Sequence, residues 1–359
     1  MRIGLLTGGG DAPGLNAVIR AAVLSADYRG WDVVGIRHGF TGLLGACDLM
    51  PLTRAKVSGI AHLGGTILRT TNRGNPLCFP VRNADGSTTE TDCSLEVMEN
   101  ARQHGIDAII AIGGDGTLAI ALALVDQGLK VVGVPKTIDN DVSGTITTFG
   151  FDTAVNTAID ALDKLHTTAE SHDRVIVMEV MGRDAGFIAL HAGVAATADV
   201  ILIPEIPYDI DRVCEKIMAR DSAGQNFSIV VAAEGALPKH SGHETAEGSG
   251  ASRTIRAGSV AERLVGEIYA GTGKECRSLV LGHLQRGGMP TGYDRLLAAR
   301  FGAATVTAIE NEAWGQMVAL QSPHIVTVPI REVIRDQKRV DLTHDVVLAA
   351  RSTGISLGD

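Results

Sequence analysis

Several features are missing from this sequence, and each absence excludes a class of protein. The five cysteines include no C-x-x-C pair, and such an odd, scattered set is typical of a reducing cytoplasm rather than of a disulfide-stabilised secreted protein. No apolar run reaches the length of a membrane span, so we do not expect a membrane protein. The net charge of −9 leaves no excess of positive charge, so we expect neither DNA nor an anionic membrane as a partner.

The length and composition indicate a globular protein with more than one core. The chain has 359 residues, which suits two domains of ordinary size, and 45% of them are hydrophobic, enough to bury real cores. The first seven residues indicate a buried strand rather than a signal peptide, which also favours a cytoplasmic protein.

Short runs rich in Val and Ile alternate with amphipathic helical patterns. The apolar runs lie at residues 3–6, 31–36, 108–112, 131–134, 175–180, 200–203, 228–232 and 278–281, and the helical patterns at 15–25, 95–104 and 156–165. Because these runs are nearly all apolar, they predict an α/β fold of parallel sheets with helices on both faces. Residues 79–92 and 237–257 are polar and rich in turn-forming residues, so we expect exposed loops there.

Two glycine-rich segments follow predicted strands, where ligands of parallel α/β sheets bind. Gly8 to Gly14 lead into a helix, and their bare backbone N–H groups suit a phosphate, although a tight turn without a ligand is the alternative. Gly113 to Thr117 follow a later strand, and the carboxylate of Asp115 among them suits Mg²⁺ beside nucleotide phosphates. Sugar, lipid and NAD kinases use similar versions of the second segment, so it predicts a phosphate donor but no particular acceptor.

The segment from Pro135 to Asp141, Pro-Lys-Thr-Ile-Asp-Asn-Asp, gathers two carboxylates, an amide, a hydroxyl and an ammonium at one strand end. Phosphoryl transfer to an alcohol needs a base near the hydroxyl proton and cations around the phosphoryl group. An Asp-Asn turn or a helix cap without a catalytic role is the alternative.

Three further strand ends carry polar groups. Met181 to Gly186 offer a backbone turn and Arg183, and Glu234 follows the run at 228–232. Gly282 to Gly288, with Arg277 just upstream, offer two guanidiniums and an imidazole, which suits a phosphomonoester. The segment from His240 to Glu244 has metal-ligand letters, but it lies in a polar loop, so we favour a solvated loop over a metal site.

Together these segments resemble the 6-phosphofructokinase family, bacterial type, from near the first residue to about residue 300. The matching pieces, in the family's order, are GGGDAPGLN, GGDGT, PKTIDND, GFDTA, SHDR, MGRDAG, PE, AEG and GHLQRGG. The resemblance implies two three-layer αβα domains with the active site between them. It implies a donor domain of residues 1–150 plus about 285–335 and a sugar-phosphate domain of residues 151–284 plus about 336–359.

The family phosphorylates fructose 6-phosphate at its 1-hydroxyl with Mg²⁺ as cofactor, and the resemblance assigns roles to individual residues. Asp139 is implied as the base, with Thr137 holding the transferring phosphoryl, Asp141 the metal-phosphate assembly, and Arg183 stabilising the transition state. Asp115 is implied as the Mg²⁺ ligand. The implied nucleotide-side residues are Gly10, Arg73, Asp115, Gly116 and Thr117, and the implied sugar-phosphate residues are Thr137, Asp139, Arg174, Met181, Gly182, Arg183, Glu234, Arg277, His283 and Arg286. Arg174 and Arg277 are expected to reach a neighbouring subunit's site, which implies a homodimer or a homotetramer.

Two positions bear on the phosphoryl donor. ATP users of the family keep Gly at position 116, whereas pyrophosphate users usually carry Asp there and Lys at position 136. This chain combines Gly116 with Lys136, the pairing of a mixed-substrate subgroup. Because an Asp would exclude ATP whereas an extra cation does not, we expect ATP as donor and keep a diphosphate-dependent phosphotransferase as the alternative.

Two more distant alternatives remain. An NAD or lipid kinase would share the GGDGT-like loop but not the combination of TIDND with GHLQRGG. A sugar-phosphate sensor without activity would be expected to have lost Asp115 or Asp139, and this chain keeps both. Activity on sedoheptulose 7-phosphate is not decided by these residues.

Overall fold

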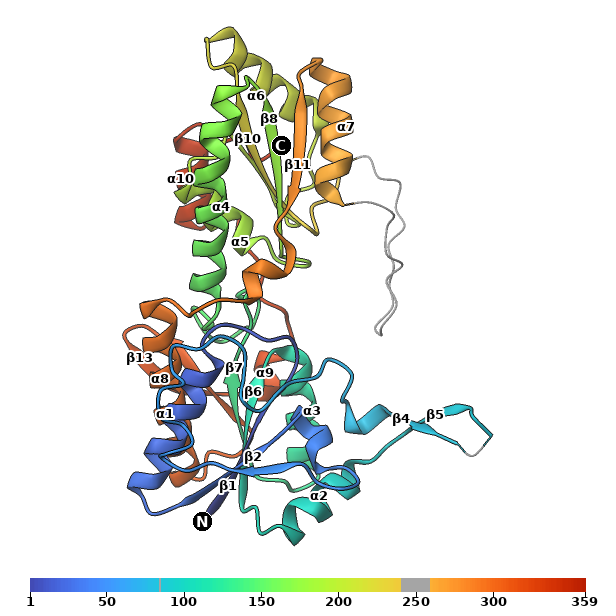
Figure 1. The fold of residues 1–359 in the computed structure, drawn as a ribbon, viewed down its shortest axis with the longest axis vertical. Helices are drawn as coiled ribbons and strands as arrows, with labels where there is room; N and C mark the ends of the chain where they lie inside the picture. Colours follow the sequence, from blue (N-terminus) through green and yellow to red (C-terminus); the bar gives the residue numbers. More distant parts are fainter. Residues whose placement is uncertain (84, 240–258) are drawn as a thin grey trace. The chain divides into compact units, whose positions relative to one another are not determined.

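The computed structural model describes residues 1–83, 85–239 and 259–359, and the chain in it divides into two compact units (Figure 1). The first unit contains Met1–Thr153 and Arg286–Lys338, and the second contains Ala154–Gln285 and Arg339–Asp359. Each unit is therefore built from two separate stretches of chain.

The first unit is built on a seven-stranded sheet with the order β13-β12-β7-β6-β1-β2-β3. The five central strands are parallel, and β3 and β13 pair antiparallel at the two edges. The strands are β1 (Arg2–Thr7), β2 (Asp32–Ile36), β3 (Leu49–Pro51), β6 (Ala108–Gly113), β7 (Val131–Pro135), β12 (Gln316–Gln321) and β13 (His324–Pro329).

Helices cover both faces of this sheet, which explains why its central strands are largely apolar. Ile3 and Leu5 of β1 belong to a core cluster shared with α1 (Leu15–Tyr28) and α8 (Gly292–Glu310), which pack against each other (Figure 1). Leu6 of the same strand belongs to a cluster shared with α2 (Ser94–Gln103) and α3 (Asp115–Asp126). Alternate side chains of one strand thus enter different cores, and neither face is left for polar residues.

The second unit has a four-stranded parallel sheet with the order β11-β8-β10-β9. Its strands are β8 (Val175–Val180), β9 (Val200–Leu202), β10 (Ser228–Ala233) and β11 (Cys276–Val280). Side chains of α6 (Ile210–Ser222) and α7 (Val260–Thr272) share a core cluster with Val175, Val177 and Val230 of this sheet. The other helices are α4 (Phe151–Ser171), whose first turn belongs to the first unit, α5 (Phe187–Ala195), the short α9 (Ile330–Val333) of the first unit, and α10 (Asp345–Ser352). Both units are α/β with mostly parallel sheets, so the predicted fold class is confirmed.

Two expectations about local structure need correction. Residues 79–92, expected as a loop, contain an exposed hairpin of β4 (Phe79–Arg82) and β5 (Thr88–Thr91), with a backbone bond from Asn83 N to Ser87 O of 2.8 Å across its turn. The run of Thr residues in β5 favours a strand, a signal that the polarity of the segment concealed. The strand expected at 278–281 begins two residues earlier, at Cys276.

The predictions about residues 237–257 and about membrane-spanning segments can be compared only with the part of the chain that the structure describes. His240, His243 and Glu244 lie outside the described residues, as does most of the loop expected at 237–257. In the part of the chain that the structure describes, no helix is long and apolar enough to cross a membrane.

Candidate active site

The glycine-rich turn after β1 is held by two cations of the first unit. The Lys136 ammonium donates a hydrogen bond to the carbonyl of Gly10, and the Arg286 guanidinium donates to the carbonyl of Asp11 at 3.2 Å. A Cβ at Gly10 would lie 2.7 Å from Nη1 of Arg286, so a larger residue there would displace the guanidinium. With its carbonyls turned towards these cations, the turn is fixed before any phosphate arrives.

Lys136 is only 4% exposed, and its surroundings alter its basicity. Burial, followed by the positive charge of Arg286, lowers the pKa of Lys136 to about 8, although Asp11, Asp139 and Asp141 act in the opposite direction. The ammonium therefore persists at neutral pH and loses its proton only under mildly alkaline conditions.

The second glycine-rich turn lies directly beside the first. Gly8 N donates to Ile112 O at 2.9 Å, and Thr117 of α3 fills the space between the turns. A Cβ at Gly8 or Gly113 would approach Thr117 Oγ1 to 2.6 or 2.4 Å, so both positions require glycine. Gly116, by contrast, has nothing within 4 Å of the place a Cβ would take, so its side faces open space.

Asp115, the first residue of α3, has the surroundings of a cation ligand. Its Oδ1 is buried, and no hydrogen-bond partner for it is found among the residues that the structure describes. Burial, and then the negative charge of Asp141, raise the pKa of Asp115 to about 7. A buried oxygen without a donor, close to a second negative charge, fits a hard cation such as Mg²⁺.

The protein itself supplies few metal ligands. Within residues 1–83, 85–239 and 259–359, no group of three or more His, Cys, Asp or Glu side chains could hold a metal ion. A Mg²⁺ ion bound by Asp115 would therefore take its other ligands from water and from donor phosphates, as this ion usually does.

The segment after β7 is a tightly bonded turn. Thr137 Oγ1 accepts from Asp139 N at 3.0 Å, and the Thr137 carbonyl accepts from Thr148 Oγ1 at 2.7 Å. Asn140 lies in the left-handed region with φ of 54°, and its Oδ1 accepts from Thr148 N at 3.1 Å. Asp141 accepts from Gln337 Nε2 at 2.9 Å. These bonds fix Asp139 and Asp141 on either side of a residue in an uncommon conformation.

Arg73 follows a stretch of chain that packs on the first glycine turn. Gly9 N donates to Thr71 O at 3.1 Å, and Thr70 Oγ1 donates to Gly9 O at 2.5 Å. The segment that looks irregular in sequence therefore supports the turn, and Arg73 itself is exposed beside it.

In the second unit, the ends of β8 and β10 form a second group of predicted site residues. Gly235 N donates to Gly182 O at 3.2 Å, and a Cβ at Gly235 would lie 1.8 Å from the Arg183 carbonyl, so the two strand ends touch through backbone alone. Arg183 and Glu234 are exposed at these ends, and so is His283, just after β11. Arg286, which sequence reasoning grouped with them, lies in the first unit beside Gly10.

Gln285 is a residue of this region that sequence reasoning missed. It is fully buried, accepts from Met181 N at 3.3 Å and donates to the Gly282 carbonyl at 3.1 Å. It thereby ties the turn after β8 to the turn after β11. The signal was its place in the GHLQRGG segment, between Leu284 and Arg286.

Arg174 and Arg277 lie at the other end of the same sheet, where its parallel strands begin. Arg174 directly precedes β8 and Arg277 pairs with Ile176 near the start of that strand, whereas Met181 follows its end. The six residues of β8, at about 3.3 Å each, separate the two ends of this strand by roughly 20 Å. Both arginines contact Glu275, with 3.0 Å between Arg174 Nη2 and Glu275 Oε1. These arginines are therefore too far away to bind the same phosphate as the residues at the other end.

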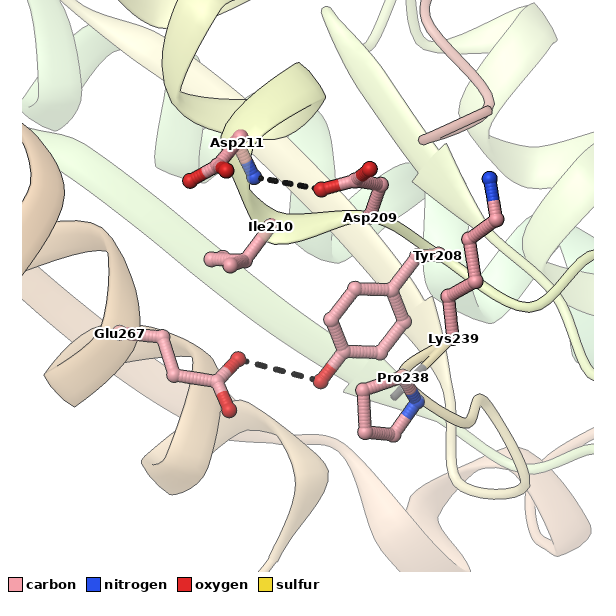
Figure 2. A pocket seen from close by; sticks show the side chains of 7 residues that line it. All are labelled: Tyr208, Asp209, Ile210, Asp211, Pro238, Lys239 and Glu267. Carbon is pink, nitrogen blue, oxygen red and sulfur yellow. Dashed lines mark hydrogen bonds between the residues drawn. The ribbon is translucent and has the colours of Figure 1, made fainter. Parts of the chain in front are cut away.

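A pocket of about 300 Å³ lies elsewhere in the second unit (Figure 2). Its lining residues are Tyr208, Asp209, Ile210, Asp211, Pro238, Lys239 and Glu267. None of the predicted site residues is among them. With three carboxylates against one ammonium, this pocket is unsuited to a sugar phosphate.

Comparison with known proteins identifies the family of this chain. The model of the family described as phosphofructokinase matches residues 2–309. The chain belongs to the phosphofructokinase family. The predicted family resemblance is thereby confirmed.

Curated relatives extend over the whole phosphofructokinase chain. An ATP-dependent 6-phosphofructokinase of Chloroflexus aurantiacus is 54% identical over 100% of this chain and 98% of the relative. An ATP-dependent 6-phosphofructokinase 2 of Clostridium perfringens is 46% identical with the same coverage. A pyrophosphate–fructose 6-phosphate 1-phosphotransferase of Amycolatopsis mediterranei is 48% identical over 95% of this chain and 96% of the relative. Percent identity alone thus does not separate the two donors.

Solved structures show the same phosphofructokinase fold. Phosphofructokinase of Pichia pastoris matches with a TM-score of 0.79 and 29% identity, and this chain spans 99% of its own length but 37% of that chain. A pyrophosphate-dependent phosphofructokinase of Marinobacter aquaeolei matches with a TM-score of 0.79 and 21% identity, covering 100% of this chain and 93% of the other. The second likeness establishes the fold alone.

Proposed function

We propose that this protein transfers the γ-phosphoryl group of ATP to the 1-hydroxyl of fructose 6-phosphate, giving fructose 1,6-bisphosphate and ADP. Relatives named ATP-dependent 6-phosphofructokinase, which match over the full length of this chain, support the reaction. The residues after β1, β6 and β7 supply the groups that the reaction needs. A glycolytic role in the cytoplasm belongs to the same proposal.

The residues of the first unit act on the donor and on the proton. The backbone N–H groups of the two glycine turns, with Gly10 and Thr117, bind the donor phosphates, and Asp115 holds Mg²⁺, which neutralises charge on those phosphates when bound. Asp139 accepts the proton of the 1-hydroxyl as the bond to phosphorus forms. Thr137 holds the transferring phosphoryl group, and Asp141 helps to hold the metal and the phosphates bound to it.

The residues of the second unit recognise the sugar phosphate. Met181, Gly182 and Glu234 bind the sugar, His283 contributes an imidazole, and Arg183 stabilises charge in the transition state. Arg174 and Arg277, at the other end of the sheet, bind the 6-phosphate in the site of a neighbouring subunit. The functional protein is therefore a homodimer or a homotetramer.

ATP as the donor rests on one observation, the open space around Gly116. A side chain there would enter the space that a nucleotide needs, and an Asp would also repel its α-phosphate. Lys136 is the observation that favours pyrophosphate, and a relative of that specificity exists. Because the Lys136 ammonium already bonds to the Gly10 carbonyl, it is engaged within the protein and is compatible with ATP.

The deciding experiment is a coupled assay of fructose 6-phosphate turnover with Mg-ATP and with Mg-pyrophosphate in parallel. We expect turnover with ATP and none with pyrophosphate. Gly116→Asp is the matched variant, and it should lose turnover with ATP because the new carboxylate obstructs the nucleotide. Turnover with pyrophosphate while ATP is inert would establish the alternative donor.

A further inference from the structure

Residues 336–338, the last three of the first unit, bond to the turn that carries Asp139 and Asp141. Ser143 Oγ donates to the Asp336 carbonyl at 2.5 Å, and Gln337 Nε2 donates to Asp141 Oδ2 at 2.9 Å. Lys338 N donates to the Asp141 carbonyl at 3.0 Å. This segment lies beyond residue 309, where the match to the family model ends.

The Lys338 ammonium makes the most concentrated of these contacts. Its Nζ donates to Asn140 Oδ1 at 3.2 Å, to Thr145 O at 3.1 Å and to Ile146 O at 2.7 Å. One cation thus joins the middle of the catalytic turn to the chain that follows it. A lysine can do this because an ammonium has three donors and reaches all three acceptors at once.

Lys338 contacts a residue with an uncommon backbone conformation. Asn140 has φ of 54°, a conformation that residues other than glycine adopt rarely and only where the surroundings support it. Its side-chain oxygen receives two hydrogen bonds, from Thr148 N and from Lys338 Nζ. Since Asn140 stands between Asp139 and Asp141, its backbone conformation sets the directions of both carboxylates.

Charge strengthens the arrangement. Burial lowers the pKa of Lys338 to about 8, while the negative charge of Asp141 opposes that shift. The same Asp141 charge acts on Asp115. The positive charge of Lys338 therefore acts on Asp141, which in turn acts on the proposed metal ligand Asp115.

We propose that Lys338 is a positioning residue for phosphoryl transfer, which holds Asn140 in its left-handed conformation and thereby orients Asp139 and Asp141. This inference rests on the proposed function. It adds a residue that no motif identified. Because the Lys338 ammonium acts through Asn140, we expect its substitution to change turnover more than substrate binding.

The test compares Lys338→Met and Lys338→Arg with the wild-type protein in the coupled assay with fructose 6-phosphate and the donor that supports turnover. We expect Lys338→Met to lower kcat by roughly 10- to 100-fold, because a small misplacement of a catalytic group has effects of that size. Both KM values should change less than about threefold, and Lys338→Arg should restore at least half of the lost kcat on a logarithmic scale.

Lys216→Met is the matched control. Lys216 Nζ also bonds to a backbone carbonyl, Gly354 O at 2.7 Å, but this bond lies in the second unit. The kcat of Lys216→Met should therefore equal that of wild type.

A kcat for Lys338→Met within twofold of wild type overturns the proposal. So does a rise in KM with kcat unchanged, because that would place Lys338 in substrate binding. If Lys338→Met does not fold, as judged by its thermal unfolding transition, Lys338→Gln takes its place, since the amide still reaches one carbonyl. Absence of turnover by the wild-type protein with either donor would count against the proposed function itself.

A double-mutant cycle with Asn140→Gly separates positioning from general stabilisation. Glycine adopts a positive φ without support from neighbouring side chains. The fold-reduction in kcat caused by Lys338→Met should therefore be at least threefold smaller in the Asn140→Gly background than in the wild-type background. An equal reduction in both backgrounds would show that Lys338 does not act through Asn140 and would overturn the proposal.

Discussion

At the scale of single residues, the contacts of Lys136 bear on the choice of phosphoryl donor, which the sequence alone leaves open at this position. In sequence it is the one member of its segment that favours pyrophosphate. In the structure its ammonium is buried and donates to the Gly10 carbonyl, while Arg286 holds the neighbouring carbonyl of Asp11. Both cations therefore act first on the shape of the glycine turn, and their effect on the donor follows from that shape.

Asp139 is the residue whose substitution tests the chemistry directly. Asp139→Ser keeps a small polar side chain but removes the carboxylate that we propose accepts the proton, so we expect kcat to fall by roughly 10²–10⁴. Steady-state kinetics with fructose 6-phosphate would measure the change, and KM values close to wild type would show that binding is intact. A near-normal kcat in this variant would remove Asp139 from the role of base.

At the scale of elements, the N-termini of α4 and α8 are joined by a buried carboxylate. Asp294 of α8 is fully buried, and its Oδ2 accepts from Thr153 N at 2.8 Å and from Thr153 Oγ1 at 2.6 Å. In return Thr291, the N-cap of α8, donates from its hydroxyl to Asp152 Oδ2 at 2.5 Å. Thr153 Oγ1 also accepts from Thr291 N at 3.0 Å, so these side chains join the first turns of the two helices. Asp152 and Thr153 of the GFDTA segment thus have a structural role, although neither has a proposed catalytic role.

This joint predicts a pH dependence of stability. Burial raises the pKa of Asp294 from 3.8 to about 6, so between these values the folded protein holds a proton that the unfolded chain has lost. The stabilising contribution of Asp294 is therefore complete below about pH 4 and declines as the pH rises through 6. Asp294→Asn keeps an acceptor oxygen but cannot ionise. We expect its free energy of unfolding, relative to wild type, to rise by about 1 kcal/mol between pH 5 and pH 7.

Urea unfolding of both proteins at the two pH values would measure that difference. Asp294→Ala is the control, because it removes the acceptor and should be less stable than the Asn variant at both pH values. A difference between Asn variant and wild type that does not change with pH would mean that Asp294 titrates normally.

At the scale of the whole molecule, the predicted sugar-phosphate residues occupy two ends of one sheet. Arg183 and Glu234 lie at the carboxyl ends of β8 and β10, whereas Arg174 and Arg277 lie where β8 and β11 begin. One substrate molecule cannot span that separation, so we propose that the two sets serve different substrate molecules. On this proposal a subunit is incomplete without a neighbour, which is the structural reason to propose an oligomer.

Mixing two inactive variants tests this directly. Asp139→Ser subunits lack the proposed base, and Arg174→Ala subunits lack the arginine proposed to serve the neighbouring site. We expect a mixture that has been dissociated and reassociated to recover turnover, because a hybrid contains sites with Asp139 from one subunit and Arg174 from the other. Each variant reassociated alone is the control. Recovery no greater than the sum of the separate activities would show that Arg174 acts within its own subunit.

The class of fold followed from the sequence because its signal is local. Strands covered on both faces are apolar over four to six residues in a row, and that pattern is readable without any tertiary contact. The hairpin at 79–92 was missed for the converse reason, since two exposed strands show no apolar run and depend on each other for their hydrogen bonds. The site residues taken from contiguous motifs remain predictions, and the geometry groups them by unit and by end of the sheet.

The sequence by itself determined the family and the α/β class, and it predicted the segment that carries the carboxylates at 139 and 141, because each of these depends on neighbouring residues. Only the tertiary structure decided what holds that segment. Lys136 meets Gly10 across 126 positions, Thr153 meets Asp294 across 141, and Asn140 meets Lys338 across 198. Contacts over such separations form when strands and helices pack, and no local pattern of residues encodes which distant side chain will arrive.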